Sequence, residues 1–140
     1  MSNLEDWWES IWDALVAKVI AMTDFDSDTV FYGEKFPPVK FPSAFVCPSI
    51  TESQPATMHE SFWNPTFEIG VVTEDADTKA GKKLAFKLCF KIARTLLTDR
   101  HLGDLLQNME CSVITPNWRG LDTGLEQHWV AVTVVCQRKK

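Results

Sequence analysis

The segment from Asp75 to Leu106, DADTKAGKKLAFKLCFKIARTLLTDRHLGDLL, constrains the fold most, because it is the longest stretch with clear helical periodicity. At roughly 100° per residue, its apolar side chains sweep about two-thirds of the circumference, which is wider than the stripe of a helix that covers a single surface. We therefore expect one helix that ends near Thr98 and is buried on more than one side. A sheet is expected on one side, and the N-terminal helix or a neighbouring subunit on the other.

Alternating apolar and polar residues predict two strands before this helix. Ser43 to Ile50 (SAFVCPSI) is the first, and Pro48 places it at a sheet edge or ends it. Thr57 to Thr73 is the second, either as one long strand or as two strands joined by a bend at Asn64-Pro65. The polar segment between them, Thr51 to Ala56, is expected to be a loop.

The residues after the helix predict a corner and two further strands. Thr98 to Leu106 turns the chain through the sequence Asp-Arg-His-Leu-Gly. Met109 to Thr115 and the strongly β-branched Glu126 to Gln137 are the strands. Between them, Pro116 to Leu125 has the Pro, Asn and two Gly of a long hairpin loop.

Asn3 to Thr23 predicts a further helix, with one apolar face and acidic residues opposite. Trp8 and Trp12 lie on the apolar face, and Trp7 falls at its edge. Two interpretations remain open: the helix covers a sheet, or its tryptophan-rich surface lies partly against another subunit.

Asp24 to Pro42 is expected to be irregular, since it contains a glycine and three prolines. Asp24, Asp26 and Asp28 resemble the start of a calcium loop, but the glycine and the distal glutamate of an EF-hand are missing. A solvated turn is the preferred interpretation, followed by an extended connector at FPPVKFP.

The predicted order is therefore helix, strand, strand, helix, strand, strand. Two hairpins joined by a helix define an α+β layer. We expect a mainly antiparallel sheet of about four strands with the N-terminal helix and the central helix packed on it. The chain of 140 residues suits a single domain, spanning 1–140.

Composition excludes some classes of protein. A net charge of −5 argues against a general nucleic-acid binder. Six Trp and nine Phe against one Tyr indicate a large core, a partner surface, or both. No apolar run approaches the roughly 20 residues of a membrane span, and the N-terminal residues lack the pattern of a signal peptide, so we expect a soluble protein without membrane contacts.

No pattern of residues predicts catalysis, a metal site or a cofactor. The four cysteines, each inside an apolar run and without a CxxC pair, are expected to be reduced and buried, which suggests an intracellular folding compartment. His59, His101 and His128 do not stand beside a cysteine, and neither a GxSxG motif nor a phosphate-binding glycine loop occurs. The chain is expected not to be an enzyme and to need no cofactor. The cysteines are Cys47, Cys89, Cys111 and Cys136.

The basic arc of the central helix, formed by Lys83, Lys87, Lys91 and Arg94, stands out in an acidic protein. One interpretation is a solvated helix face. The other is a face presented to an acidic neighbour or to DNA that passes close by, since clustered cations attract anionic partners.

Several stretches carry a resemblance to a known family: the FPSAFVCPSI strand, the TFEIGVVTE strand that leads directly into a long helix, the ARTLLTDRHLGDLL corner and the final HWVAVTVVCQRK strand. With this order of elements, the sequence resembles the tail terminator (tail completion) proteins of long-tailed bacteriophages and related archaeal viruses. Leu97, Asp99, Leu102 and Gly103 come nearest to a local signature.

The resemblance implies a structural protein of the virion that forms a homo-oligomeric ring, typically a hexamer, on the finished tail tube. Such a ring stops tube polymerisation and joins the tail to the head. The implied partners are other copies of the chain, the tail tube protein and the head-tail connector proteins, with DNA only as passing cargo. The implied location is the tail or neck of the virion, and the host cytoplasm during assembly. The alternatives are another neck or tail-tube protein, or an intracellular adaptor domain that binds a protein through the aromatic helix.

Partner contacts are expected from aromatic and basic residues. Trp118 and Arg119 are residue types enriched at interfaces, and their loop, together with Thr57 to Trp63, is expected to protrude toward neighbouring subunits. The full set of expected contact residues is Trp7, Trp8, Trp12, Trp63, Trp118, Arg119, Lys83, Lys87, Lys91 and Arg94.

Overall fold

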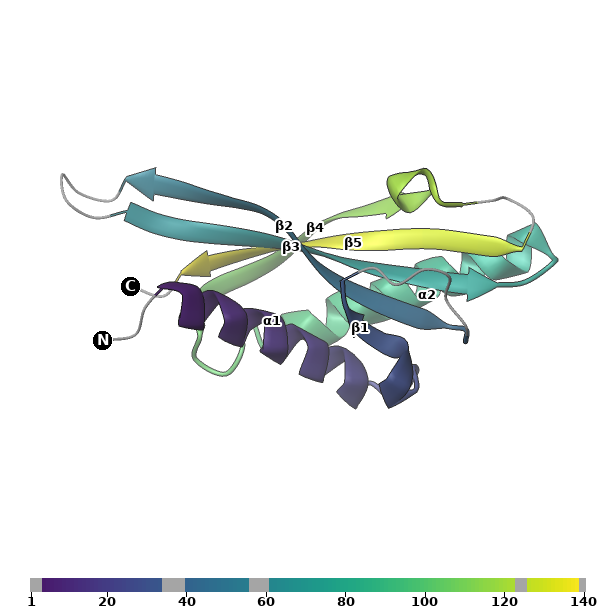
Figure 1. Cartoon of the computed structure of the whole chain (residues 1–140), viewed down its shortest axis with the longest axis horizontal. Helices are drawn as coiled ribbons and strands as arrows, with labels where there is room; N and C mark the ends of the chain where they lie inside the picture. Colours follow the sequence, from purple (N-terminus) through teal and green to yellow (C-terminus); the bar gives the residue numbers. More distant parts are fainter. Residues whose placement is uncertain (1–3, 34–39, 56–60, 123–125, 139–140) are drawn as a thin grey trace.

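The computed structural model describes residues 4–33, 40–55, 61–122 and 126–138, which form a sheet and two long helices (Figure 1). The elements are α1 (Leu4–Ala21), the 3₁₀ turn η1 (Ser27–Thr29), β1 (Val30–Tyr32), β2 (Ser43–Pro55), β3 (Ser61–Glu74), α2 (Thr78–Leu97), β4 (Leu106–Pro116), the 3₁₀ turn η2 (Trp118–Gly120) and β5 (Gln127–Arg138). The predicted α+β class is confirmed. Neither helix is both long enough and apolar enough to cross a bilayer in the part of the chain described.

The sheet has five strands in the order β1-β2-β3-β5-β4, one more than the sequence predicted. The pairs β2–β3, β3–β5 and β4–β5 are antiparallel, as expected. β1 is the addition and runs parallel to β2, with Val30 opposite Ala44. Its three residues, inside a segment expected to be irregular, are too few to show a period of two.

β2 and β3 form a longer ribbon than expected. β2 continues to Pro55, so the loop predicted from Thr51 was wrong for residues 51–55, and β3 runs without a break through Asn64-Pro65. Pairing between β3 and β5 ends at Thr66–Val135, so β3 has a neighbour on one side only at Pro65, where a missing N–H is tolerated. The ribbon therefore projects beyond β5 (Figure 1), while residues 57–60 of the predicted strand lie outside the described residues.

Both helices pack on the same face of the sheet. The prediction that α1 covers a sheet is confirmed, and the end of α2 falls where it was expected. The buried face of α2 is narrower than its apolar arc: Leu84 and Phe90 remain 44% and 56% exposed. The sequence predicted that α2 would be buried on more than one side, and within a single chain this second contact covers only part of its apolar surface. The buried residues of α2 are Gly81, Ala85, Leu88, Cys89, Ile92 and Leu96.

The corner after α2 joins the two helices. The Asp99 carboxylate lies 3.1 Å from Lys18 Nζ of α1 and accepts the Gly103 N–H at 3.1 Å. The hydrogen bond from Lys18, and after it that from Gly103, holds the pKa of Asp99 below its usual value. Gly103 has φ +63°, a conformation that glycine adopts without strain.

The opposite face of the sheet is partly covered by η2, which folds back over β3 and β5. Trp118 is 1% exposed, and its indole N–H donates to Glu68 Oε2 at 2.9 Å. Its ring packs against Trp129 and over Gly70, where an added Cβ would lie only 2.3 Å from the Trp118 ring. The sequence predicted that this loop would present Trp118 to neighbouring subunits, and this was wrong. The ring is buried instead, because Gly70 has no side chain and leaves space for it.

Replacing Gly70 with alanine should destabilise the fold by about 1–3 kcal/mol, because the new methyl group overlaps the Trp118 ring. In a Trp118→Ala background the same replacement should be neutral or stabilising, since alanine is otherwise better than glycine within a strand. The free energies of unfolding of the four variants of this cycle, measured in denaturant, test the contact. An equal penalty in both backgrounds would contradict it.

Candidate assembly surfaces

An aromatic and acidic groove runs along the outer edge of α1, beside the edge strand β1. Trp12 is one of its lining residues; it donates its indole N–H to the Val46 carbonyl at 2.8 Å and packs edge-on against Tyr32, with ring centroids 5.3 Å apart. Tyr32 is 55% exposed, and its hydrogen bond to Asp13 raises the pKa of its hydroxyl above the usual value. We call this the acidic groove; it is lined by Glu5, Trp8, Glu9, Trp12, Asp13 and Tyr32.

A second, mainly apolar hollow shares Glu5 and Trp8 with the acidic groove and lies toward the start of α1. It lies at the base of the β2–β3 ribbon, where Trp63 of β3 and Thr51 of β2 face Trp7 and Trp8. Trp7 donates its indole N–H to the Leu105 carbonyl at 2.9 Å. The α1 tryptophans therefore hold the helix on the sheet and also leave aromatic edges at the surface.

The exposed side of α2 carries a ridge of alternating cations and phenylalanines, whose side chains border an open hollow. Phe90 is the most exposed apolar residue on it, at 56%. Lys91 does not belong to this ridge, because its Nζ lies 2.6 Å from the Asp24 carboxylate, in the connection after α1. The sequence had placed Lys91 in one arc with the other cations. We call the remainder the basic ridge: Lys83, Phe86, Lys87, Phe90 and Arg94.

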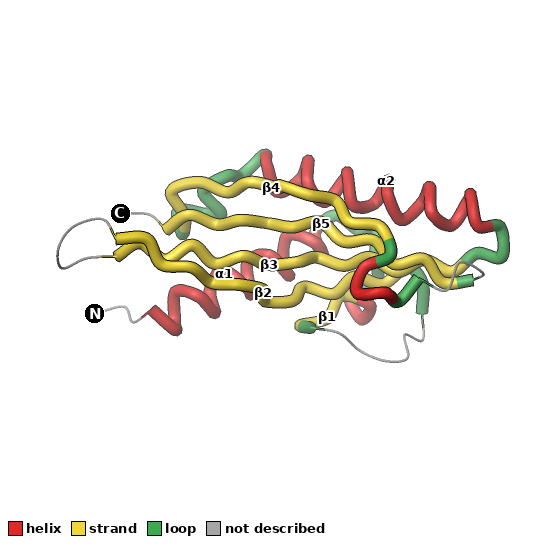
Figure 2. Tube along the Cα trace, turned by 90° about the horizontal axis from the view of Figure 1, so that it is seen from above, coloured by secondary structure: helices red, strands yellow, loops and turns green. Residues whose placement is uncertain are grey.

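The acidic groove and the basic ridge lie on opposite flanks of the molecule. Figure 2 shows α2 on the β4 side of the sheet and β1 at the other side. The Asp13–Tyr32 hydrogen bond ties the groove to β1. Lys91 and Lys18 lie between the two flanks. Lys91 of α2 pairs with Asp24 after α1, and Lys18 of α1 pairs with Asp99 after α2.

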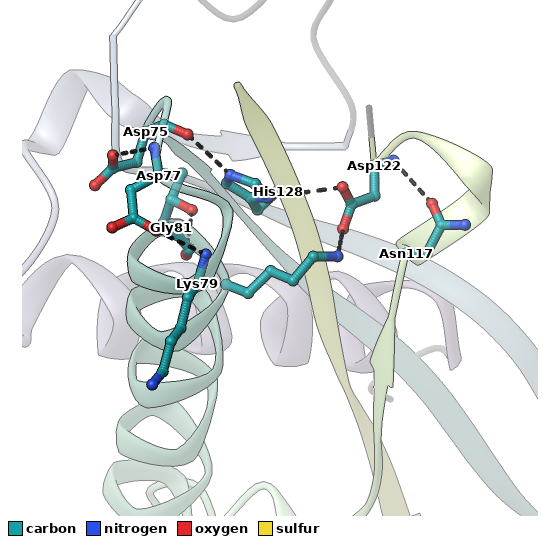
Figure 3. Close-up of polar contacts among 9 residues, drawn as sticks. Asp75, Asp77, Lys79, Gly81, Asn117, Asp122 and His128 are labelled. Atoms are coloured by element: carbon teal, nitrogen blue, oxygen red, sulfur yellow. Dashed lines mark hydrogen bonds and ion pairs between the residues drawn. The ribbon is translucent and has the colours of Figure 1, made fainter. Parts of the chain in front are cut away.

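A buried histidine links the start of α2 to the η2 segment (Figure 3). His128 is fully buried; its Nε2 lies 3.1 Å from the Asp75 carbonyl oxygen, which can only accept, so Nε2 carries the hydrogen. Its Nδ1 lies 3.7 Å from Asp122, whose carboxylate pairs with Lys82 at 2.8 Å. Gly81 makes room for the imidazole, since a Cβ there would lie 2.2 Å from His128 Cδ2. These contacts give the histidine a packing role.

The described residues offer little for catalysis. His101 is exposed in the corner, and His59 lies outside the described residues. Among the described residues, His, Cys, Asp and Glu form no group of three that could hold a metal ion. Burial raises the pKa of the Cys47, Cys89 and Cys136 thiols to about 12 and that of Cys111 to about 11.

These thiols should react slowly with Ellman's reagent at pH 8 in the native protein, because only a small fraction of each is ionised and access is restricted. In urea all of them should react within minutes. Absorbance at the wavelength of the released thiolate follows both reactions. A cysteine that reacted as fast in the native state as in urea would reveal an activated nucleophile and contradict this account.

Arg119 of η2 is the remaining expected contact residue. Its guanidinium lies over the Trp118 ring, 4.7 Å from the centroid, with Nη2 3.7 Å from Glu68 Oε1. Trp118 itself is buried in the chain's own second core cluster, so it is not available as a surface contact. Tyr32, Phe86 and Phe90 were not among the contact residues predicted from the sequence. The two phenylalanines could have been found, because they follow Lys83 at helical spacing, three and seven residues later.

Comparison with known families finds no model that matches the sequence, and comparison with curated proteins finds no match. Solved structures do show the fold. A chain in a structure described as "Virion of native gene transfer agent (GTA) particle" superimposes with a TM-score of 0.60 at 12% sequence identity. The similarity covers 94% of this chain and 97% of that chain. At this identity it establishes a shared fold.

Proposed function

We propose that this chain is a structural protein of a phage-like virion and acts as a tail terminator. The observation that carries the proposal is the shared fold, which extends over nearly the whole of both this chain and the gene transfer agent virion chain. The sequence independently resembles tail terminators at the corner that contains Asp99 and Gly103. In the structure these two residues bond to each other and fix the end of α2.

The proposed mechanism is physical. Copies of the chain form a closed ring, expected to be a hexamer, on the last ring of the tail tube; this covers the surface on which the next tube ring would assemble. The other side of the ring receives the head-tail connector, and DNA crosses the ring only as cargo. The apolar surface that α2 leaves exposed, and the hollow beside Trp63 and Trp8, suit such protein–protein contacts.

Immunogold labelling of virions with an antibody against this chain tests the assignment. A terminator is expected to be labelled at one position, the junction of head and tail, because a single ring is present in each particle. Particles without the head, separated by gradient, should keep the label at the tail end, and pre-immune serum is the control.

Other results would contradict the terminator role in different ways. Label along the tail would assign the chain to the tube, and label retained on isolated heads would assign it to the connector. Unlabelled particles would favour the second candidate, an intracellular adaptor that binds a protein segment at the apolar hollow of α1 and the β2–β3 ribbon.

A further inference from the structure

We infer that the basic ridge of one copy packs against the acidic groove of the next copy. The inference rests on the proposed ring and goes beyond it by naming the two surfaces that meet. It follows from the chemistry, the spacing and the placement of these two flanks.

The two surfaces are complementary in charge and alike in apolar character. Lys83 and Lys87 have no ion-pair partner within the described residues, and the same is true of Glu5 and Glu9. The phenylalanines between the cations and the aromatic rings between the acids give each surface an apolar centre with a charged border. Interfaces with this composition gain affinity from the apolar centre and orientation from the charges.

The charges also match in spacing. Glu5, Glu9 and Asp13 follow one another at four-residue steps on α1, and Lys83 and Lys87 are one such step apart on α2. Because a helix rises about 1.5 Å per residue, each step is about 6 Å along either axis. Two helices that pack side by side can therefore bring successive acids opposite successive cations.

The placement of the flanks selects the kind of assembly. Each copy carries one acidic groove beside β1 and one basic ridge on the β4 side, so a contact between them is head-to-tail and leaves an unused groove and ridge at the two ends. Contacts of this type close into a ring when the rotation between copies allows it. A two-fold dimer through either flank would instead oppose like charges, which is unfavourable.

A second copy suits the ridge better than DNA does. The partly buried Phe86 and the exposed Phe90 lie among its cations, and apolar rings of this kind are enriched at protein–protein interfaces, whereas phosphates are contacted by basic and polar groups. The chain is also acidic overall, with a net charge of −5, so other copies of it are anionic partners that the ridge attracts.

Charge reversal on each flank tests the pairing. The groove variant carries Glu5→Lys and Glu9→Lys, and the ridge variant carries Lys83→Glu and Lys87→Glu. In sedimentation velocity, the unmodified chain is expected to form the closed oligomer, and each variant should lose it, because like charges then meet at every contact. An equal mixture of both variants should recover the oligomer, since each altered flank meets a complementary one. Circular dichroism checks that each variant folds.

Two further variants complete the design. Glu74→Lys with Glu110→Lys makes the same change in net charge as the groove variant at two exposed residues that line neither the acidic groove nor the basic ridge, and should assemble normally. Neutral substitutions, Glu5→Gln with Glu9→Gln, should weaken assembly and should not be rescued by the ridge variant. They keep the test decisive if a reversed variant does not fold.

The outcomes separate this inference from the proposed function. If both reversed variants still assemble, the pairing of flanks is overturned and the ring stands. If the unmodified chain remains a monomer at millimolar concentration and the mixture does too, the ring is contradicted as well. If the ridge variant assembles normally but loses binding to a double-stranded DNA fragment, the ridge belongs to nucleic acid and the inference is overturned.

Discussion

The packing of α1 and α2 on one face of the sheet is the constraint on which the rest of the structure depends. Ile11 and Leu15 of α1, with Ala85, Cys89 and Ile92 of α2, are fully buried there. With those faces committed to the sheet, α1 turns its acids outward beside β1 and α2 turns its cations outward on the β4 side. The separation of charge between the two flanks is therefore a consequence of how the core is built, and so is the head-to-tail assembly that we infer from it.

Two glycines admit large rings, Gly70 on the face of the sheet that η2 covers and Gly81 on the face that the helices cover. Gly70 lies under Trp118, and Gly81 lies against His128, so the η2 segment is held over the sheet and beside the start of α2. The Asp122–Lys82 ion pair joins the same two regions. This explains why residues that look exposed in the sequence, a tryptophan in a polar loop and a histidine in a strand, serve the stability of the chain itself.

Periodicity was sufficient to predict both helices, the corner after α2 and the antiparallel strands, because each is long enough to show its repeat. It could not predict β1, whose three residues gain their pairing from β2, or the extension of β2 past Ile50, which depends on the partner strand. For the assembly surface, the sequence showed the four cations of the basic arc. It could not show that Lys91 leaves this group to pair with Asp24, because the two residues are 67 positions apart in the sequence. Trp118 was misplaced for the same reason, since only the fold shows that Gly70 lies beneath it.

Zero-length cross-linking with a carbodiimide measures the central claim most directly, because it joins only amines and carboxylates that already form ion pairs. Rings assembled from equal amounts of ¹⁴N and ¹⁵N chains should yield mixed-isotope peptides that join Lys83 or Lys87 to Glu5 or Glu9, identified by mass spectrometry. Mixed peptides that join other surfaces, with Lys83 and Lys87 unmodified, would contradict the account.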